Sequence, residues 1–385
     1  MAKLGEIFNL QMGKTPARSN DAYWNGGQYN WISIADLGTY HKYTSKTKEQ
    51  ITELAVQESG IKKVPKNTVI MSFKLSLGKT AITSEEIYTN EAIMAFIPKK
   101  NYEIYPDYFY YFFSGRDWSK STNRAVMGTT LNKATLSEID IEIPSMDKQH
   151  LIVKKMDLLC RLIEFRKHQL EKLDELVKSR FIEMFGDPVC NPKGWITKPL
   201  LDMGYCKNGV NFHTGDSGME IHCLGVGDFK DLSVIDGTEH LPVIALNEAP
   251  QKESMLRDGD IVFVRSNGNK ALVGRCLVVY PHNTPTTYSG FCIRYRLTSG
   301  EVDITYLLQV LKTDTMRKKM AGRGANIQNL NQQILATLDI PLPPLDLQNQ
   351  FADFVAQVDK SKLAVQKSLE QLEILKKALM QEYFG

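Results

Sequence analysis

The sequence has little net charge, few cysteines and no long hydrophobic run. Its 385 residues include 47 Lys and Arg against 44 Asp and Glu, so any surface basic enough to hold nucleic acid must be local. The six cysteines form no C-x-x-C pair, and only Cys223 has a neighbouring histidine, His222, which favours reduced thiols over disulfides or zinc. No stretch approaches the roughly 18 apolar residues of a membrane span. We therefore expect a cytoplasmic protein of two or three domains, without signal peptide or membrane span.

Motifs of several enzyme classes are missing as well. Gly13-Lys14-Thr15 and Gly78-Lys79-Thr80 look like pieces of a phosphate-binding loop. That loop needs a glycine five residues before its Gly-Lys pair, and Phe8 and Phe73 stand there instead. The sequence has no Asn-Pro-Pro-Tyr or Asp-Pro-Pro-Tyr run, which adenine methyltransferases use to grip an extruded base, and no G-x-S-x-G motif. The seven histidines are scattered. These absences predict a chain with no catalytic site of its own.

What the sequence does contain is an internal repeat. Phe185-Gly186 recurs as Phe384-Gly385, 199 positions later, and this offset holds without a gap over more than fifty residues. It also joins Leu131-Asn132 to Leu330-Asn331, Asp140-Ile141 to Asp339-Ile340, Gln149 to Gln348, and Leu170-Glu171 to Leu369-Glu370.

Earlier segments match more loosely. Leu4–Gly13 resembles Leu200–Gly209, and Val64–Met71 resembles Leu256–Phe263. The residues at these matching positions recur in both halves, while the residues between them differ. This pattern is typical of two modules of one fold that read different targets, although a plain duplication that has drifted would look similar.

Each half has the same internal order. Short β-type runs come first, such as Val69–Phe73 and Ile261–Val264, punctuated by Gly, Asn and Pro. An apolar strand with a proline stop closes each module, at Ile139–Pro144 and Leu338–Pro344.

A helical period follows each module. Residues 147–185 contain no Gly or Pro, and apolar residues there follow steps of four and three, which is typical of a coiled-coil seam. The first seam is Ile152, Met156, Leu159, Ile163, Leu170, Leu173, Val177 and Met184, and the second is Phe351, Val355, Val358, Val365, Leu369, Leu372, Leu379 and Tyr383. Each helix could reach roughly 60 Å at about 1.5 Å per residue, so each needs a partner. Antiparallel pairing of the two would place the modules at opposite ends of a rod, and pairing between two chains is the alternative.

The predicted fold class is α+β, with two similar α/β modules joined by two long helices that form an antiparallel coiled coil. The predicted domains are residues 1–146 (first module), 147–186 (first helix), 187–344 (second module) and 345–385 (second helix).

Basic residues collect at matching places in the two modules. Residues 116–133 and 316–328 are basic stretches that precede the last strand, and residues 73–79 and 265–275 form a second pair in mid-module. Lys and Arg can neutralise phosphates, while Asn, Gln, Ser and Arg can pair with base edges. Solvated surface loops are the plainer explanation for any one of these stretches. The candidates for DNA binding are Lys14, Thr15, Lys74, Lys79, Arg124, Thr130 and Asn132 in the first module, and Arg265, Asn267, Asn269, Lys270, Arg275, Arg323, Asn326 and Gln328 in the second.

The order of these segments resembles the specificity subunit of Type I restriction–modification systems, essentially from end to end. The resemblance is carried by Leu4–Ile7 leading to Gly13–Pro16, Met71–Lys79 followed by Asn90–Ala92, Ile340–Leu345 leading to Gln348, and, most specifically, the junction Met184–Pro188 with Asn191–Trp195. One departure is Val210–His213, which replaces the first module's Gly-Lys-Thr-Pro loop and puts the DNA role of that loop in doubt there.

The resemblance implies a non-catalytic subunit whose two target-recognition domains each read half of a split sequence in double-stranded DNA. It implies that the helices set the spacing and dock two methyltransferase subunits, and that translocase–nuclease subunits can join. No cofactor is expected in this chain, because S-adenosylmethionine and ATP with Mg²⁺ are used by the partner subunits. Two alternatives remain open at this point: a coiled-coil adaptor whose modules bind peptides or glycans, and an autonomous enzyme with an unrecognised site.

Overall fold

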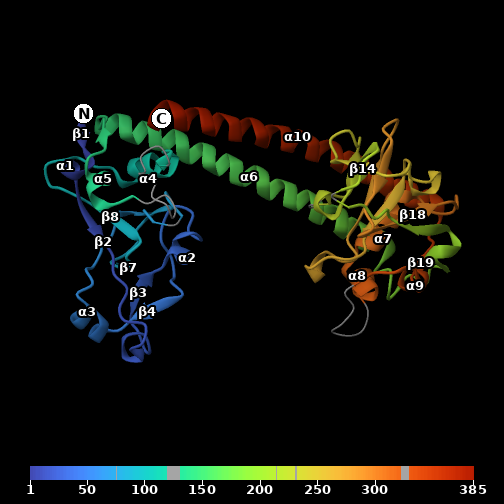
Figure 1. Cartoon of the computed structure of the whole chain (residues 1–385), viewed down its shortest axis with the longest axis horizontal. Helices are drawn as coiled ribbons and strands as arrows, with labels where there is room; N and C mark the ends of the chain where they lie inside the picture. The colour runs from blue at the N-terminus through green and yellow to red at the C-terminus, as the bar shows by residue number, and fades with distance from the viewer. Residues whose placement is uncertain (75, 119–130, 214, 230–231, 322–328) are drawn as a thin grey trace. The chain divides into compact units, whose positions relative to one another are not determined.

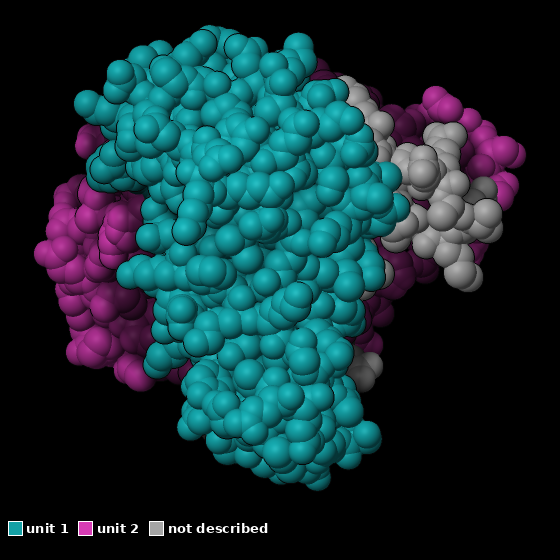
Figure 2. Space-filling view, turned by 90° about the vertical axis from the view of Figure 1, so that its left-hand side faces the viewer, with its two compact units in different colours: residues 1–167, 367–385 teal, residues 168–366 magenta. Residues whose placement is uncertain are grey.

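The structure of the protein is a computed structural model, which describes all residues except 75, 119–130, 214, 230–231 and 322–328. The chain forms two compact units, coloured in Figure 2. Unit 1 comprises residues 1–167 and 367–385, and unit 2 comprises residues 168–366. This division follows spatial contacts and cuts both long helices, whereas the four domains predicted from the sequence follow the order of the chain.

Unit 1 contains two main sheets in its described part. A four-stranded sheet has the order β2 (Phe8–Met12), β8 (Ile93–Pro98), β5 (Val69–Ser72), β6 (Thr80–Ile82), with antiparallel pairing throughout. A three-stranded sheet has the order β4 (Glu49–Ile51), β3 (Tyr29–Ile32), β7 (Tyr88–Thr89), in which β3 and β7 are parallel. The ends of the module meet in a short pair, β1 (Ala2–Lys3) with β9 (Asp140–Ile141). Its helices are α1 (Leu4–Ile7), α2 (Ile34–Leu37), α3 (Glu53–Ser59), α4 (Pro106–Gly115) and α5 (Lys133–Ser137).

Aromatic side chains form the centre of unit 1. Strand β5 is buried along its whole length, as expected for an apolar run covered on both faces. Helix α4 lies against β5 and β6, and its Phe109 and Phe113 meet Phe8 of β2 at ring-centroid distances of 5.0 and 6.3 Å. The Phe8–Phe109 pair is packed edge to face, an arrangement that adds stability beyond the area that the rings bury.

Unit 2 repeats this arrangement. Its main sheet has the order β11 (Gly204–Asn208), β18 (Cys292–Leu297), β15 (Asp260–Val264), β16 (Cys276–Tyr280), β13 (Val234–Asp236). Its three-stranded sheet is β14 (Val243–Leu246), β12 (Met219–Leu224), β17 (Thr286–Tyr288), again with one parallel pair, and β10 (Thr197–Pro199) pairs with β19 (Asp339–Pro341). The helices of this module are α7 (Ile304–Lys312), α8 (Asp314–Ala321) and α9 (Gln332–Ala336). The two modules therefore share strand order and direction, and unit 2 adds β13 at one edge.

The two long helices are α6 (Met146–Phe185) and α10 (Leu345–Phe384), shown green and red in Figure 1. In unit 1, Lys155 of α6 meets Tyr383 of α10 at 3.3 Å. In unit 2, Asp174 of α6 forms an ion pair with Lys362 of α10 at 2.7 Å. Lys155 comes before Asp174 along α6, whereas their partners run in the opposite order along α10, where Tyr383 comes after Lys362. The predicted antiparallel pairing is confirmed, and Gly186, at φ +79°, ends α6.

The predicted seam faces inward. Met156 is fully buried, and Ile163 and Leu369 are each 7% exposed. Repeat-equivalent seam residues do not pack together: Met156 and its equivalent Val355 belong to different cores. Met156 packs in the core of unit 1 beside Leu379, whereas Val355 packs against the core of unit 2. Antiparallel pairing brings the start of one helix against the end of the other, so repeat-equivalent residues lie far apart along the pair.

Several residues that recur at the 199-residue offset prove to be scaffold. Gln149 and Gln348 are both fully buried. Each side chain accepts a backbone N–H from the segment before α4 or α7, and each donates to the proline carbonyl five residues earlier, at 2.9 and 2.8 Å. These bonds fix the start of each long helix on its module, which explains why the sequence repeats there.

Candidate nucleic-acid interface

Three loops of unit 1 meet at one end of its four-stranded sheet. They follow β2 (residues 13–16), follow β5 (residues 73–74) and precede β8 (residues 90–92), and they are joined by backbone hydrogen bonds. The bonds run from Gly13 N to Ile93 O (3.1 Å), Lys14 N to Thr89 O (2.8 Å), Phe73 N to Ala92 O (3.0 Å) and Leu131 N to Phe73 O (3.2 Å). We call this set of loops, together with Leu131, the loop edge of unit 1.

Unit 2 has the same loop edge, made of residues 209–212, 265–267, 289–291 and 329–330. Its bonds run from Gly209 N to Cys292 O (3.2 Å), Val210 N to Tyr288 O (2.9 Å), Arg265 N to Phe291 O (2.8 Å) and Leu330 N to Arg265 O (2.7 Å). The bonds correspond one by one. In both units the approach is close enough to require glycine, because a Cβ on Gly13 or Gly209 would lie 2.2 or 2.1 Å from a backbone oxygen.

Because the bonds correspond, the loop edges can be aligned residue by residue. Lys14 corresponds to Val210, Phe73 to Arg265, Lys74 to Ser266 and Ala92 to Phe291. The sequence interpretation set residues 73–79 against 265–275 as matching basic loops, but the structure pairs Arg265 with a buried phenylalanine. The backbone is therefore conserved between the modules, whereas the side chains that it presents differ in charge, size and hydrogen-bonding capacity.

The candidates of the first module lie on or near its loop edge. The Lys14 ammonium donates to Ser59 O, and the Thr15 hydroxyl donates to the Glu91 carboxylate. Lys74 is half-buried, with its ammonium 5.3 Å from the centre of the Phe73 ring. Lys79 lies further along the same loop, against Gly38 at the end of α2. All four follow or precede a strand of the four-stranded sheet at the end where its loop edge lies.

Asn132 has a structural task that accounts for its recurrence. Its side chain accepts the backbone N–H of Thr135 at 2.8 Å and so caps the start of α5. Asn331 caps α9 in the same way, at 2.8 Å from Ile334 N. The capping bond explains why this asparagine repeats, although Asn132 remains exposed beside the loop edge.

Four candidates of the second module, Arg265, Asn267, Asn269 and Lys270, lie in one loop after β15. The guanidinium of Arg265 donates to Gly290 O at 3.2 Å. The Asn267 side chain accepts the N–H of Asn269 at 2.8 Å, and the Asn269 side chain accepts that of Ala271 at 3.1 Å. Lys270 follows and is exposed. Two asparagine turns therefore shape this loop, which leaves the amide N–H₂ groups of both side chains as donors.

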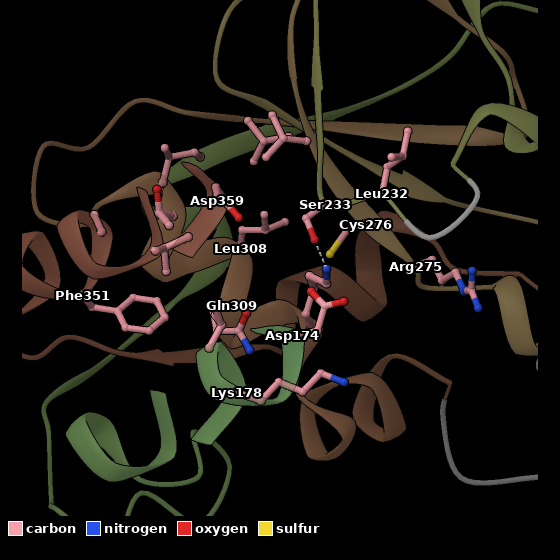
Figure 3. A pocket seen from close by; sticks show the side chains of 18 of the residues that line it. Asp174, Lys178, Leu232, Ser233, Arg275, Cys276, Leu308, Gln309, Phe351 and Asp359 are labelled. Carbon is pink, nitrogen blue, oxygen red and sulfur yellow. Dashed lines mark hydrogen bonds between the residues drawn. The ribbon is translucent and has the colours of Figure 1, made fainter. Parts of the chain in front are cut away.

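Arg275 lies elsewhere. It lines a cavity of about 520 Å³ inside unit 2, between α6, α7, α10 and the main sheet (Figure 3). In that cavity Lys312 donates to the Ser233 hydroxyl, and burial lowers the pKa of the Lys312 amine. Asp174, Lys178 and further polar side chains also line it (Figure 3). Arg275 directly precedes β16, and its side chain lines this cavity but not the one at the second loop edge.

The remaining candidates lie outside the described residues. They are Arg124, Thr130, Arg323, Asn326 and Gln328. Their segments, 119–130 and 322–328, lead directly into Leu131 and Asn329 at the two loop edges.

Two exposed aromatic residues at the second loop edge were not among the candidates. Phe291 is 63% exposed and Phe212 is 37% exposed, and both line a second cavity of about 760 Å³ with Ser266 and Asn267. Neither residue carries the positive charge or the amide group that marks most of the candidates. The signal available in the sequence was the run Ser289-Gly290-Phe291, which places a large apolar residue in a turn.

Other kinds of site are not apparent in the described part of the chain. No group of three or more His, Cys, Asp or Glu residues there is placed to hold a metal ion. All six cysteines are free thiols. No described helix combines the length and the apolar character needed to cross a membrane.

The fold and the loop edges define a class of protein: a tandem of two recognition modules whose shared scaffold presents different side chains. Comparison with known proteins identifies the family. The Type I restriction modification DNA specificity domain matches residues 1–175 and 245–374. The chain therefore belongs to the family of Type I restriction–modification DNA specificity subunits, which supply DNA specificity to their complex and are not its catalytic subunits.

Individual relatives agree with this assignment. The Type I restriction enzyme MjaIX specificity subunit of Methanocaldococcus jannaschii is 26% identical over 400 residues, covering 98% of this chain and 90% of that one. The StySPI specificity subunit of Salmonella potsdam is 26% identical and covers 73% of this chain and 65% of that one.

Two solved structures share the fold. One, described as the structural basis of complex assembly and conformational transition of the type I R-M system, has a TM-score of 0.64 at 18% identity and covers 100% of this chain and 96% of that one. The S subunit from M. genitalium has a TM-score of 0.53 at 13% identity, with 100% and 95% covered. The family assignment sets aside the adaptor and autonomous-enzyme alternatives.

Proposed function

We propose that each module reads one half of a bipartite DNA target through its loop edge, and that the long helices set the spacing between the halves. One observation carries this proposal. The hydrogen bonds that build the loop edge recur pair by pair in the two modules, while the side chains presented there do not. Such a scaffold suits two readers that approach DNA in the same way and accept different bases, since base identity is read by side chains at base edges.

The proposal assigns the DNA-binding candidates different tasks. Lys14, Lys74 and Lys79 are point charges suited to phosphates, whereas Arg265 and Asn267 carry N–H donors suited to base edges. Lys14 and Thr15 already hold partners within the chain, so DNA must replace those contacts. Arg265 also holds a partner, Gly290 O, but this bond uses one of the five N–H donors of its guanidinium.

Reconstituted complex and a substrate library randomised in each half-site test this assignment. Arg265→Ala should relax one position of the half-site read by the second module, at a cost of about 1–3 kcal/mol, and leave the other half unchanged. Lys74→Ala should weaken binding of the first half-site and lower the salt slope by about one. Lys100→Ala is the matched control, because Lys100 is exposed beyond the opposite end of β8. Unchanged preferences in both reading variants would show that the reading surface lies elsewhere.

We further propose that the outer face of α6 docks a helix of the methyltransferase subunit. In unit 1, four large apolar residues on this helix remain exposed although its seam is buried. They are Leu151 (52%), Leu158 (54%), Leu162 (39%) and Phe165 (60%). Their spacing of seven, four and three places them on one side of the helix. An apolar row of this kind, left uncovered within the chain, is typical of a protein–protein contact, and the family supplies the partner.

Co-purification tests the docking surface. Leu158→Glu combined with Phe165→Glu should abolish capture of the methyltransferase subunit and leave the fold intact, because both side chains are exposed. Glu164→Lys is the matched control on the same helix, since Glu164 is also exposed but is not three or four residues from any member of the row. Normal capture by the double variant would contradict this assignment.

A further inference from the structure

The cavity at the loop edge of unit 2 is lined in part by apolar side chains. Phe212 and Phe291 are exposed there, and Ile244 also lines it. Its polar lining includes Ser266, Asn267, Ser289 and Asn329, together with Asp228, whose carboxylate accepts the N–H of Gly225 at 2.8 Å. Among the residues that the structure describes, no Lys or Arg lines this cavity, so the described lining is better suited to base edges than to phosphates.

The aromatic residues are exposed but held on a fixed backbone. The carbonyl of Phe291 accepts the N–H groups of Arg265 (2.8 Å) and Ser266 (3.3 Å), and its own N–H donates to the Ser289 hydroxyl (3.3 Å). Gly290 N donates to Val210 O at 2.7 Å, which ties this turn to the loop that carries Phe212. A side chain on a fixed backbone loses little conformational entropy on binding. More of its contact energy therefore contributes to the binding free energy.

The first module shows what this backbone does without the aromatic. Ala92 occupies the place of Phe291, is 6% exposed, and makes the same backbone bond to Phe73. The scaffold therefore tolerates alanine at this position. The phenylalanine in unit 2 is therefore not needed to build the turn, and its ring is exposed.

We propose that Phe212 and Phe291 contact the 5-methyl group of a thymine in the half-site read by the second module, with Ser266 and Asn267 bonding base edges beside it. This inference rests on the proposed function. Within the major groove, the thymine methyl is the apolar feature that distinguishes one base pair from the others, and phenylalanine is a side chain that reads it. The contact gives the second module a preference that the first module, with Ala92, lacks at the corresponding place.

Thymine-to-deoxyuridine substitution removes only this methyl group and so tests the contact directly. The substrate is the mapped target, with each thymine of either strand replaced in turn, and the measurement is methylation by the reconstituted complex. One substitution in the second half-site should lower kcat/KM about fourfold, the effect of one buried methyl group. Phe291→Ala should lower activity on the thymine substrate and abolish the difference between thymine and uracil, while substitutions in the first half-site behave as in the wild type.

Two controls keep the result interpretable. Phe291→Ala should fold, because the first module carries alanine there, and Ile196→Ala should change nothing, because Ile196 is 81% exposed and does not line the cavity. A second half-site without an A·T pair, or a uracil effect that persists in Phe291→Ala, would overturn the inference. If Arg265→Ala still relaxes the second half-site in that case, the proposed function stands and only the thymine contact fails. If no loop-edge variant alters either half-site, the proposed function itself has failed.

Discussion

The last turn of α10 offers a sharp test of the packing, because helix ends usually fray. Phe384, the penultimate residue, is only 5% exposed. Its ring lies 5.4 Å from that of Tyr108 and 6.4 Å from that of Phe112, so it belongs to the core of unit 1. Replacing a buried phenylalanine by alanine typically costs about 3–5 kcal/mol. The last turn of a helix can collapse into part of the space, so we expect Phe384→Ala to cost about 3 kcal/mol.

Hydrogen exchange measured peptide by peptide can assign this loss to one unit. Phe384→Ala should accelerate exchange in the buried strands of unit 1. Its repeat equivalent Phe185, which is 2% exposed and lies 4.7 Å from the Tyr306 ring, should on replacement by alanine accelerate exchange in unit 2 instead. Leu363→Ala, on an exposed position of α10, should stay within about 0.5 kcal/mol. A cost below about 1 kcal/mol for Phe384→Ala, with unit 1 unchanged, would refute this account of the terminal turn.

Three further predictions concern stability and reactivity. Lys42→Met should destabilise unit 1 by about 2 kcal/mol in urea unfolding. The Lys42 ammonium lies 2.6 Å from both Asp107 and Asp157, so its loss leaves two partly buried carboxylates without their cation. An unchanged midpoint of unfolding would contradict this prediction. The pKa of His282 is raised, chiefly by its hydrogen bond to Asp236, so its stabilising contribution should be present below about pH 6 and lost as pH rises through the raised value. The difference in Tm between wild type and His282→Asn should therefore shrink at alkaline pH, and a constant difference would exclude this linkage. Burial raises the pKa of four thiols to about 12, so they should resist Ellman's reagent until the protein unfolds, and rapid reaction in the native state would contradict their burial. They are Cys206, Cys223, Cys276 and Cys292.

Much of the scaffold was predictable from the sequence, because the scaffold is what the repeat preserves. Gln149 and Gln348 recur at a fixed offset since both are buried and bonded alike, and the seam residues Met156 and Leu369 follow a helical period since both face inward. The order of strands within each sheet could not be read in this way, because non-local pairing leaves no fixed spacing in the sequence.

The loop edge was harder to predict than the scaffold. Residue type suggested Lys74 and Arg265, which do lie there, but only the backbone bonds show that Arg265 corresponds to Phe73. Asn132 looked like a reader because it repeats, yet it repeats as a helix cap. Phe291 was overlooked because an exposed phenylalanine has no distinctive sequence pattern, and its meaning depends on the fixed turn beneath it.

The most direct test of the account is the methylation pattern set by the intact complex, mapped by long-read sequencing. Because two modules with different loop edges read the two halves, the account predicts a split target of two defined half-sites separated by an unspecified spacer. It also predicts that the halves differ from each other, since Ala92 and Phe291, or Lys74 and Ser266, present different chemistry at equivalent places. A contiguous motif, or a target whose two halves are identical, would contradict the central claim that each module reads its own half of the DNA.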